Sequence, residues 1–156
     1  MSQKIVLMSS PEYFKVEYAI NPWMVAGTKV DLELAKEQWN GLKRTIEEAG
    51  AEVKVVPPSE NHPDLVFTAN SGIIRGNDVL IANFKFEERR GEEEIYIKWF
   101  KENEYNVSRI PPDYKFEGRG DAFVYGDYLV GSYGVRSDKE ALLYICLLYT
   151  SPSPRD

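Results

Sequence analysis

Short runs of apolar residues, each closed by glycine, proline, asparagine or aspartate, alternate along the chain with longer stretches of mixed polarity. Such runs are typical of strands, because the closing residues favour turns and the enclosed residues favour a pleated surface. The pattern predicts strands or short extended segments over residues 4–8, 52–56, 64–67, 72–75, 79–84, 105–110, 122–125 and 128–133.

Helices are predicted in three of the intervening stretches. The first begins at Asp31, whose carboxylate can accept the unpaired N–H groups of a first turn, and ends at Gly50. Its apolar residues recur every three or four positions and share one face: Ala35, Trp39, Leu42, Ile46 and Ala49. The second helix covers residues 92–103, and the third begins at Ser137. In the second, three residues are expected to point inward: Ile95, Trp99 and Phe100.

The second and third parts of the chain can be superimposed as a repeat. Gly76 and Asp78 fall opposite Gly126 and Asp127, and residues 70–71 fall opposite 120–121. In each copy a pair of strands leads to a helix that has an arginine ahead of it. A repeat of about fifty residues, built as strand, strand, helix and strand, predicts an α/β propeller-like array in which each unit buries its face on its neighbours. About two and a half units are present, so we expect an incomplete array.

Composition narrows the class of protein. The chain has 156 residues, of which 43% are apolar, and a formal charge of −6, which disfavours a nucleic-acid partner. Its single cysteine excludes an internal disulfide. No apolar run approaches the roughly 20 residues that span a bilayer, and the start has no signal-peptide pattern. We therefore expect a cytoplasmic protein with no membrane partner.

The last eleven residues, 146–156, resemble a translated transposase-type sequencing adapter. The helix that begins at Ser137 should continue here, yet it meets the segment 151–154, Ser-Pro-Ser-Pro, which cannot be helical. We therefore expect a native segment of residues 1–145 and a non-native tail of residues 146–156. A natural disordered tail is the alternative.

Polar residues gather at corresponding ends of the predicted strand pairs. The candidate functional residues are Asn21, Asp64, Asn70, Arg89, Arg90, Glu117, Asp121 and Arg136. Each also has an ordinary structural explanation. Asp64 follows a proline and can cap a turn, while Arg89 and Arg90 lie among five glutamates and can form a solvated charge cluster. The only histidine, His62, lies in a polar loop and is interpreted as a surface residue.

Three segments carry a resemblance when they are taken together. Residues 20–24 (Ile-Asn-Pro-Trp-Met), 67–72 (Phe-Thr-Ala-Asn-Ser-Gly) and 116–121 (Phe-Glu-Gly-Arg-Gly-Asp) resemble the guanidino-group-modifying superfamily. It includes arginine deiminases, dimethylarginine dimethylaminohydrolases, amidinotransferases and arginine dihydrolases. The resemblance covers nearly all of residues 4–145 and implies a five-unit α/β propeller, the pentein fold, of which about half is present.

The resemblance also implies roles for the polar residues. A guanidinium is planar, cationic and rich in N–H donors, so Asp64, Asn70 and Asp121 would accept its hydrogen bonds, with Asn21 among the binding residues. Arg89 or Arg90, together with Arg136, would hold the substrate's α-carboxylate. Glu117 would orient the family's catalytic histidine, which moves protons while a cysteine thiolate attacks the guanidinium carbon. We expect no cofactor and no metal.

Departures from the family pattern distinguish between the enzyme classes of this superfamily. Methylarginine hydrolases have two adjacent acids where this chain has Ala69 and Asn70, so the sequence is most similar to arginine dihydrolases. A dimethylarginine dimethylaminohydrolase, an amidinotransferase or a non-catalytic propeller module remain as alternatives. The family's histidine and cysteine lie beyond this chain, so we expect a truncated arginine-guanidine hydrolase without activity of its own. We also expect four of the candidates to converge on one concave surface: Asp64, Asn70, Glu117 and Asp121.

Overall fold

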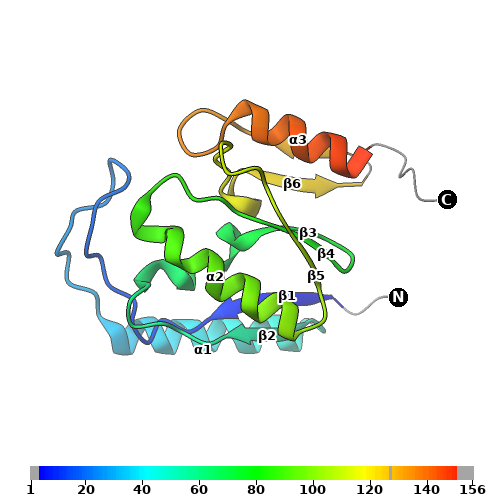
Figure 1. Ribbon diagram of the computed structural model, residues 1–156. Helices are drawn as coiled ribbons and strands as arrows, with labels where there is room; N and C mark the ends of the chain where they lie inside the picture. Colours follow the sequence, from blue (N-terminus) through cyan, green and yellow to red (C-terminus); the bar gives the residue numbers. More distant parts are fainter. Residues whose placement is uncertain (1–3, 127, 151–156) are drawn as a thin grey trace. The chain divides into compact units, whose positions relative to one another are not determined.

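A computed structural model describes residues 4–126 and 128–150 of the chain (Figure 1). The chain divides into two compact units, residues 1–68 and residues 69–156, and each is described by itself. Both combine strands with helices, which confirms the predicted mixed α/β class. Among the described residues, no helix is long and apolar enough to cross a membrane.

The first unit is a strand–helix–strand element. Strands β1 (Ile5–Ser9) and β2 (Glu52–Val56) pair in parallel, and α1 (Leu32–Glu48) connects them and runs along β2 (Figure 1). The Asp31 carboxylate accepts the Leu34 N–H at 3.0 Å, so the predicted helix cap is confirmed. Gly50 has a φ of +85°, which suits the residue that ends a helix.

The apolar face predicted on α1 is present but is not buried. No residue of α1 is buried by the part of the chain that the structure describes, and Leu42 is 56% exposed. A second expectation in this unit is wrong. Residues 64–67 are not an extended segment, because Pro63–Val66 form a 3₁₀ turn (η1) in which the Phe67 N–H donates to the Asp64 carbonyl at 2.9 Å. Proline favours the first position of such a turn because its φ is already helical.

The second unit contains two hairpins, each preceded by a 3₁₀ turn and followed by a helix. The first set consists of η2 (Thr68–Ser71), β3 (Gly72–Arg75), β4 (Asp78–Ile81) and α2 (Glu87–Glu102). The second set consists of η3 (Gly118–Gly120), β6 (Ala122–Tyr125), β7 (Tyr128–Gly131) and α3 (Lys139–Thr150). We call these sets the first and second hairpin modules. A further strand, β5 (Asn106–Arg109), follows α2 and pairs in parallel with β4.

Strand pairing in the two modules follows the predicted repeat. Gly72 pairs with Ile81 in the first hairpin, and Ala122 pairs with Gly131 in the second. The turn residues Gly76 and Gly126 have φ values of +60° and +58°. Asp127, which the sequence placed opposite Asp78, lies outside the described residues. The repeated unit is therefore observed, and its place in a five-unit propeller stays a prediction.

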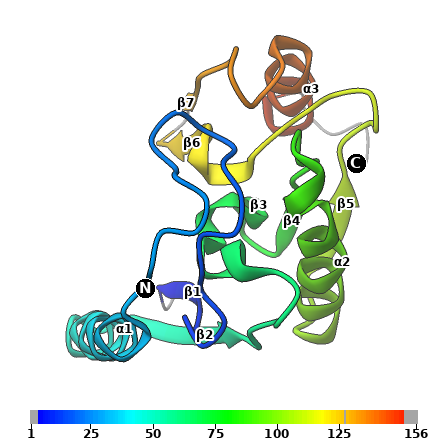
Figure 2. The same ribbon diagram turned by 90° about the vertical axis from the view of Figure 1, so that its left-hand side faces the viewer.

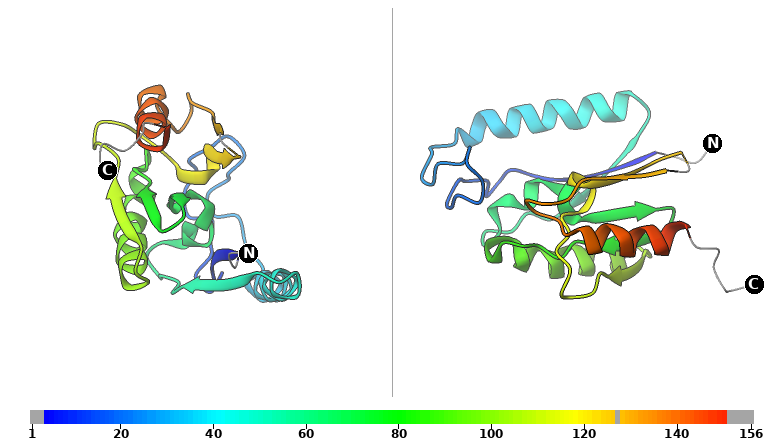
Figure 3. Two further views of the ribbon diagram at one scale, coloured as in Figure 1. Left: turned by 90° about the vertical axis from the view of Figure 1, so that its right-hand side faces the viewer. Right: turned by 90° about the horizontal axis from the view of Figure 1, so that it is seen from above.

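Each hairpin is covered by its own helix, and the two modules share one core. Figure 2 shows α2 beside β4 and β5, and Figure 3 shows α3 alongside the β6–β7 hairpin. The shared core contains Ile73, Leu80, Ile110, Phe116, Ala122, Ala141 and Ile145. A backbone bridge between Asn83 and Phe116 joins the modules further.

Both later helices begin at positions other than those predicted. Helix α2 starts at Glu87 rather than at residue 92, because two acids in its first turn favour a helix start before the apolar spacing begins. Trp99 and Phe100 are buried as expected, while Ile95 is half-buried. Helix α3 starts at Lys139 rather than at Ser137.

The predicted tail overlaps the end of α3. Cys146, Leu147 and Leu148 belong to this helix and are exposed. Their exposure agrees with the expectation that this stretch packs poorly. Residues 151–156 and the side chain of Tyr149 lie outside the described residues, so the non-native origin of residues 146–156 stays a prediction.

Candidate functional site

Three candidate residues and one further residue lie together in the second unit, on the turn before β6 and on the segment before α3. We use the name acid cluster for Glu117, Asp121, Arg136 and Ser137, which are joined by direct hydrogen bonds and ion pairs. Asn70 is attached to it through the backbone, because its amide Nδ2 donates to the Glu117 carbonyl at 3.1 Å. The acid cluster holds two carboxylates and one guanidinium.

Glu117 is the most deeply buried acid of the acid cluster, at 1% exposure. Its Oε2 lies 3.4 Å from Nη1 of Arg136, while Oε1 has no hydrogen-bond partner among residues 4–126 and 128–150. Burial raises the pKa of Glu117 above its ordinary value, and the charges of Arg136 and Arg89 partly oppose that rise. A buried oxygen of this kind is costly unless a donor reaches it.

Asp121 accepts one hydrogen bond on each carboxylate oxygen. Nη2 of Arg136 donates to Oδ1 at 2.6 Å, and the Ser137 hydroxyl donates to Oδ2 at 2.7 Å. Arg136 therefore bridges both acids of the acid cluster. Each carboxylate oxygen has two lone pairs, so Asp121 can accept further donors without losing these contacts.

Two glycines allow the turn before β6 to approach Asn70 closely. Gly118 has a φ of +61°, and a Cβ atom there would lie 2.7 Å from both the Asn70 carbonyl oxygen and the Gly72 nitrogen. A Cβ atom on Gly120 would lie 2.5 Å from Nδ2 of Asn70. Neither position has room for a side chain, which explains why glycines flank residue 119 in the 116–121 segment.

Arg89 lies in the first turn of α2 and is 3% exposed. Its guanidinium makes two hydrogen bonds to Glu92, at 2.8 and 2.7 Å, and lies over the Phe84 ring at 4.5 Å from the centroid. The solvated charge cluster considered for this arginine is therefore wrong. Arg90 is different, because it is half-exposed and donates to the carbonyls of Phe84 and Lys85, each at 3.2 Å.

The remaining candidates, Asn21 and Asp64, belong to the first unit. Asn21 is exposed, and its Oδ1 accepts the N–H groups of Trp23 and Met24 at 3.0 and 3.1 Å, which is a turn of the kind asparagine commonly stabilises. Asp64 is buried in η1. Its predicted convergence with the acid cluster stays a prediction.

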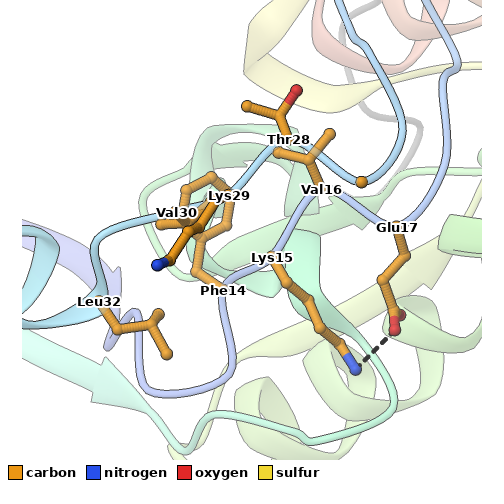
Figure 4. Close-up of a pocket in the computed structure, with 9 residues that line it drawn as sticks. Phe14, Lys15, Val16, Glu17, Thr28, Lys29, Val30 and Leu32 are labelled. Carbon is orange, nitrogen blue, oxygen red and sulfur yellow. Dashed lines mark ion pairs between the residues drawn. The ribbon is translucent and has the colours of Figure 1, made fainter.

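His62 and the pocket of the first unit fit structural roles. His62 lies 2.9 Å from the Ser59 hydroxyl through Nδ1, and burial lowers its pKa. An open pocket in this unit is formed by residues 14–17 and 27–30 together with Leu32 (Figure 4). Lys15 and Glu17 form an ion pair of 2.7 Å at its rim. None of the predicted site residues lines it.

Ser137 is the member of the acid cluster that sequence reasoning missed. The sequence predicts only a helix start at this position, and serine is a common residue there. In the structure its hydroxyl contacts Asp121 and the Glu117 backbone instead. No local pattern distinguishes these two uses of a serine, since the partners lie 16 and 20 residues earlier in the chain.

The chain is similar to a known family and to several characterised proteins. The family described as "N,N dimethylarginine dimethylhydrolase, eukaryotic" matches residues 11–147. The bifunctional arginine dihydrolase/ornithine cyclodeaminase ArgZ of Synechocystis is 43% identical over 143 residues, which are 90% of this chain and 20% of that protein. The N(G),N(G)-dimethylarginine dimethylaminohydrolase of Mycobacterium tuberculosis is 37% identical over 134 residues, which are 86% and 44% of the two chains.

Solved structures show the same relationship. The N-terminal domain of ArgZ, a cysteine-to-serine mutant bound to substrate, superimposes with a TM-score of 0.87 at 39% identity, over 94% of this chain and 55% of that one. The chain belongs to the N,N-dimethylarginine dimethylhydrolase family of guanidino-group-modifying proteins. Within that superfamily it lies near the arginine dihydrolase branch, as the sequence predicted. It spans between a fifth and about half of the length of these relatives.

Proposed function

We propose that this chain is the amino-terminal part of a hydrolase that attacks the guanidinium group of arginine. The supporting observation is the acid cluster, in which two carboxylates face a single guanidinium and one buried oxygen of Glu117 has no partner among the described residues. A site with excess negative charge and an unused acceptor is suited to a cationic group rich in N–H donors.

The proposed roles combine these contacts with those that the family resemblance implies. Asp121 and Asn70 bind the substrate. For Asp64 and Asn21, the substrate-binding role that the resemblance implies stays a prediction. Arg136, of which 39% of the side chain is exposed, is suited to the α-carboxylate because its neighbours leave it accessible. Arg89 or Arg90 would share this role with Arg136, as the resemblance implies. Glu117 is the catalytic residue of this chain, because its Oε1 accepts from the histidine that the rest of the enzyme supplies and so orients it.

The bond-breaking groups are proposed to lie in the remainder of the enzyme. Attack on a guanidinium carbon requires a strong nucleophile and a proton carrier with a pKa near neutrality. The printed sequence has one cysteine, in the predicted tail, and one histidine, in a polar loop. Cys146 is not the proposed nucleophile. The chain alone therefore binds arginine without hydrolysing it.

The proposed reaction converts arginine and two water molecules into ornithine, two ammonia molecules and carbon dioxide. Ala69 and Asn70, in place of two adjacent acids, favour this outcome over the hydrolysis of methylated arginine. A second candidate, release of dimethylamine from dimethylarginine, is favoured by the matching family's own description. The two candidates differ in the amine that leaves.

The test compares the full-length enzyme with the 156-residue chain. Each is incubated with arginine and with dimethylarginine, and ammonia, dimethylamine, ornithine and citrulline are measured. We expect ornithine and ammonia from arginine with the full-length enzyme only. Dimethylamine as the main product would support the second candidate. Ammonia release by the chain itself that disappears in Cys146→Ser would show that this cysteine is a genuine nucleophile and contradict the proposed truncation.

A further inference from the structure

The Ser137 hydroxyl is buried inside the acid cluster. Ser137 is 1% exposed, and its Oγ lies 3.0 Å from the Glu117 backbone nitrogen and 2.7 Å from Oδ2 of Asp121. One side chain thus contacts both acids of the acid cluster, one through its backbone and the other through its carboxylate.

The direction of both hydrogen bonds is fixed by the groups involved. A backbone N–H can only donate, so the Ser137 oxygen accepts from Glu117. A serine hydroxyl has a single proton, and that proton is therefore directed at Oδ2 of Asp121. Oδ2 accepts this hydrogen bond, which holds the carboxylate in one orientation.

The neighbours of Ser137 attach the same segment to the same turn. Arg136 binds both acids on one side. On the other side the Asp138 carboxylate accepts the Lys115 N–H at 2.7 Å, and the Asp138 N–H donates to the Lys115 carbonyl at 2.8 Å. Three successive residues ahead of α3 therefore bind the stretch that carries Glu117 and Asp121. Ser137 is the uncharged one, and it contacts both acids.

We propose that Ser137 is a positioning residue for guanidinium binding, because it fixes the Asp121 carboxylate and the Glu117 backbone relative to each other. It acts through Asp121 and does not itself contact the substrate. This inference rests on the proposed function, since it assigns Asp121 to the guanidinium.

The test uses the full-length enzyme and five variants. Ser137→Ala removes the hydroxyl, whereas Ser137→Thr keeps it. Ser108→Ala is the matched control, because it removes a serine hydroxyl that donates to the Val79 carbonyl at 3.3 Å. Asp121→Asn, alone and combined with Ser137→Ala, shows whether the effect passes through Asp121. KM and kcat for arginine are measured with each protein, together with the melting temperature.

We expect Ser137→Ala to raise the KM for arginine about 10- to 100-fold with a much smaller change in kcat, because the loss of a hydrogen bond to a charged group weakens binding by such factors. Ser137→Thr and Ser108→Ala should both have the KM of the wild-type enzyme. In the Asp121→Asn background, Ser137→Ala should add little. If Ser137→Ala does not fold, Ser137→Cys, which has a similar size but only weak hydrogen bonds, replaces it with the same expectation.

Other outcomes separate this inference from the proposed function. If the wild-type enzyme acts on no guanidine substrate, the proposed function fails and takes this inference with it. If the wild-type enzyme is active and Ser137→Ala lowers only the melting temperature, Ser137 is structural and the inference alone is overturned. An equal KM increase in the Asp121→Asn background would likewise overturn it, because the effect would not pass through Asp121.

Discussion

The two hairpin modules each have an arginine near the start of the helix, and the two arginines have different surroundings. In the first module Arg89 is 3% exposed, bonded twice to Glu92 of its own helix and stacked on Phe84. In the second module 39% of the Arg136 side chain is exposed, and it binds two acids 15 and 19 residues earlier in the chain.

This difference shows that the same residue type, at similar positions of a repeat, can have two different roles. The first arginine neutralises a buried glutamate within one turn of helix, so its loss affects the fold. The second arginine joins the acid cluster to the segment before α3 and stays accessible, so its loss should affect binding more than folding. The superimposed sequences suggest that the two arginines are equivalent, but the residues that each one contacts determine its role.

The largest expected effect separates the two arginines. Arg89→Ala should destabilise the protein by about 3–5 kcal/mol, because it removes the ion pair between Arg89 and the fully buried Glu92 carboxylate. Arg136→Ala should cost less, about 1–2 kcal/mol, since solvent screens the contacts of this partly exposed guanidinium, although the buried Glu117 carboxylate loses one of them. Urea unfolding of both variants measures the difference. The double variant Arg89→Met/Glu92→Leu should recover most of the loss, and equal costs for the two single variants would contradict the comparison.

Two glycines with the same backbone conformation provide the next test. Gly118→Ala, in the second module, should cost about 2–4 kcal/mol, because a left-handed φ is strained for alanine and its Cβ would meet the backbone of Asn70. Gly76, in the first hairpin turn, has a φ of +60°, and a Cβ atom there would have no other atom within 4 Å. Gly76→Ala should therefore cost only about 1 kcal/mol. Thermal or urea unfolding gives both values. Equal losses would mean that the turn before β6 does not depend on its close approach to Asn70.

A smaller effect is expected from the pH dependence of the acid cluster. Burial raises the pKa of Glu117 in the folded chain above its ordinary 4.5, so the folded state holds this proton more tightly than the unfolded state. Stability is therefore lost as the pH rises from about 4.5 through the raised pKa. Glu117→Gln removes that loss, so its stability relative to wild type should increase from about pH 4 to about pH 7. Unfolding experiments across this range check the sign, and a relative decrease would contradict it.

The sequence predicted the elements that depend on local chemistry. The helix cap at Asp31, the end at Gly50, and strands such as β2 and β6 agree with the structure because capping, turn residues and apolar alternation act over a few positions. The start of α2 was missed because its first turn is made of charged residues, which show no apolar spacing.

The site was predicted only in part, for a physical reason. Glu117, Asp121 and Arg136 were candidates and lie together, because the motif spacing fixes them at the ends of one hairpin module. The partners of Arg89 and the role of Ser137 could not be predicted. A hydrogen bond such as that from Ser137 to Asp121 joins residues separated by a complete hairpin, and only the folded backbone decides which polar groups meet.

The central claim is that the acid cluster binds a guanidinium, and NMR titration of the chain tests it directly. Arginine is added to the 15N-labelled protein, and the backbone amide signals of Gly118, Gly120 and Asp121 are followed. Citrulline, which has the same backbone with an uncharged urea group, is the matched ligand, and Asp121→Asn is the matched variant. We predict concentration-dependent shifts of these signals with arginine, weak shifts with citrulline, and a loss of the response in the variant. Equal shifts with both ligands, or an unchanged response in Asp121→Asn, would contradict the account.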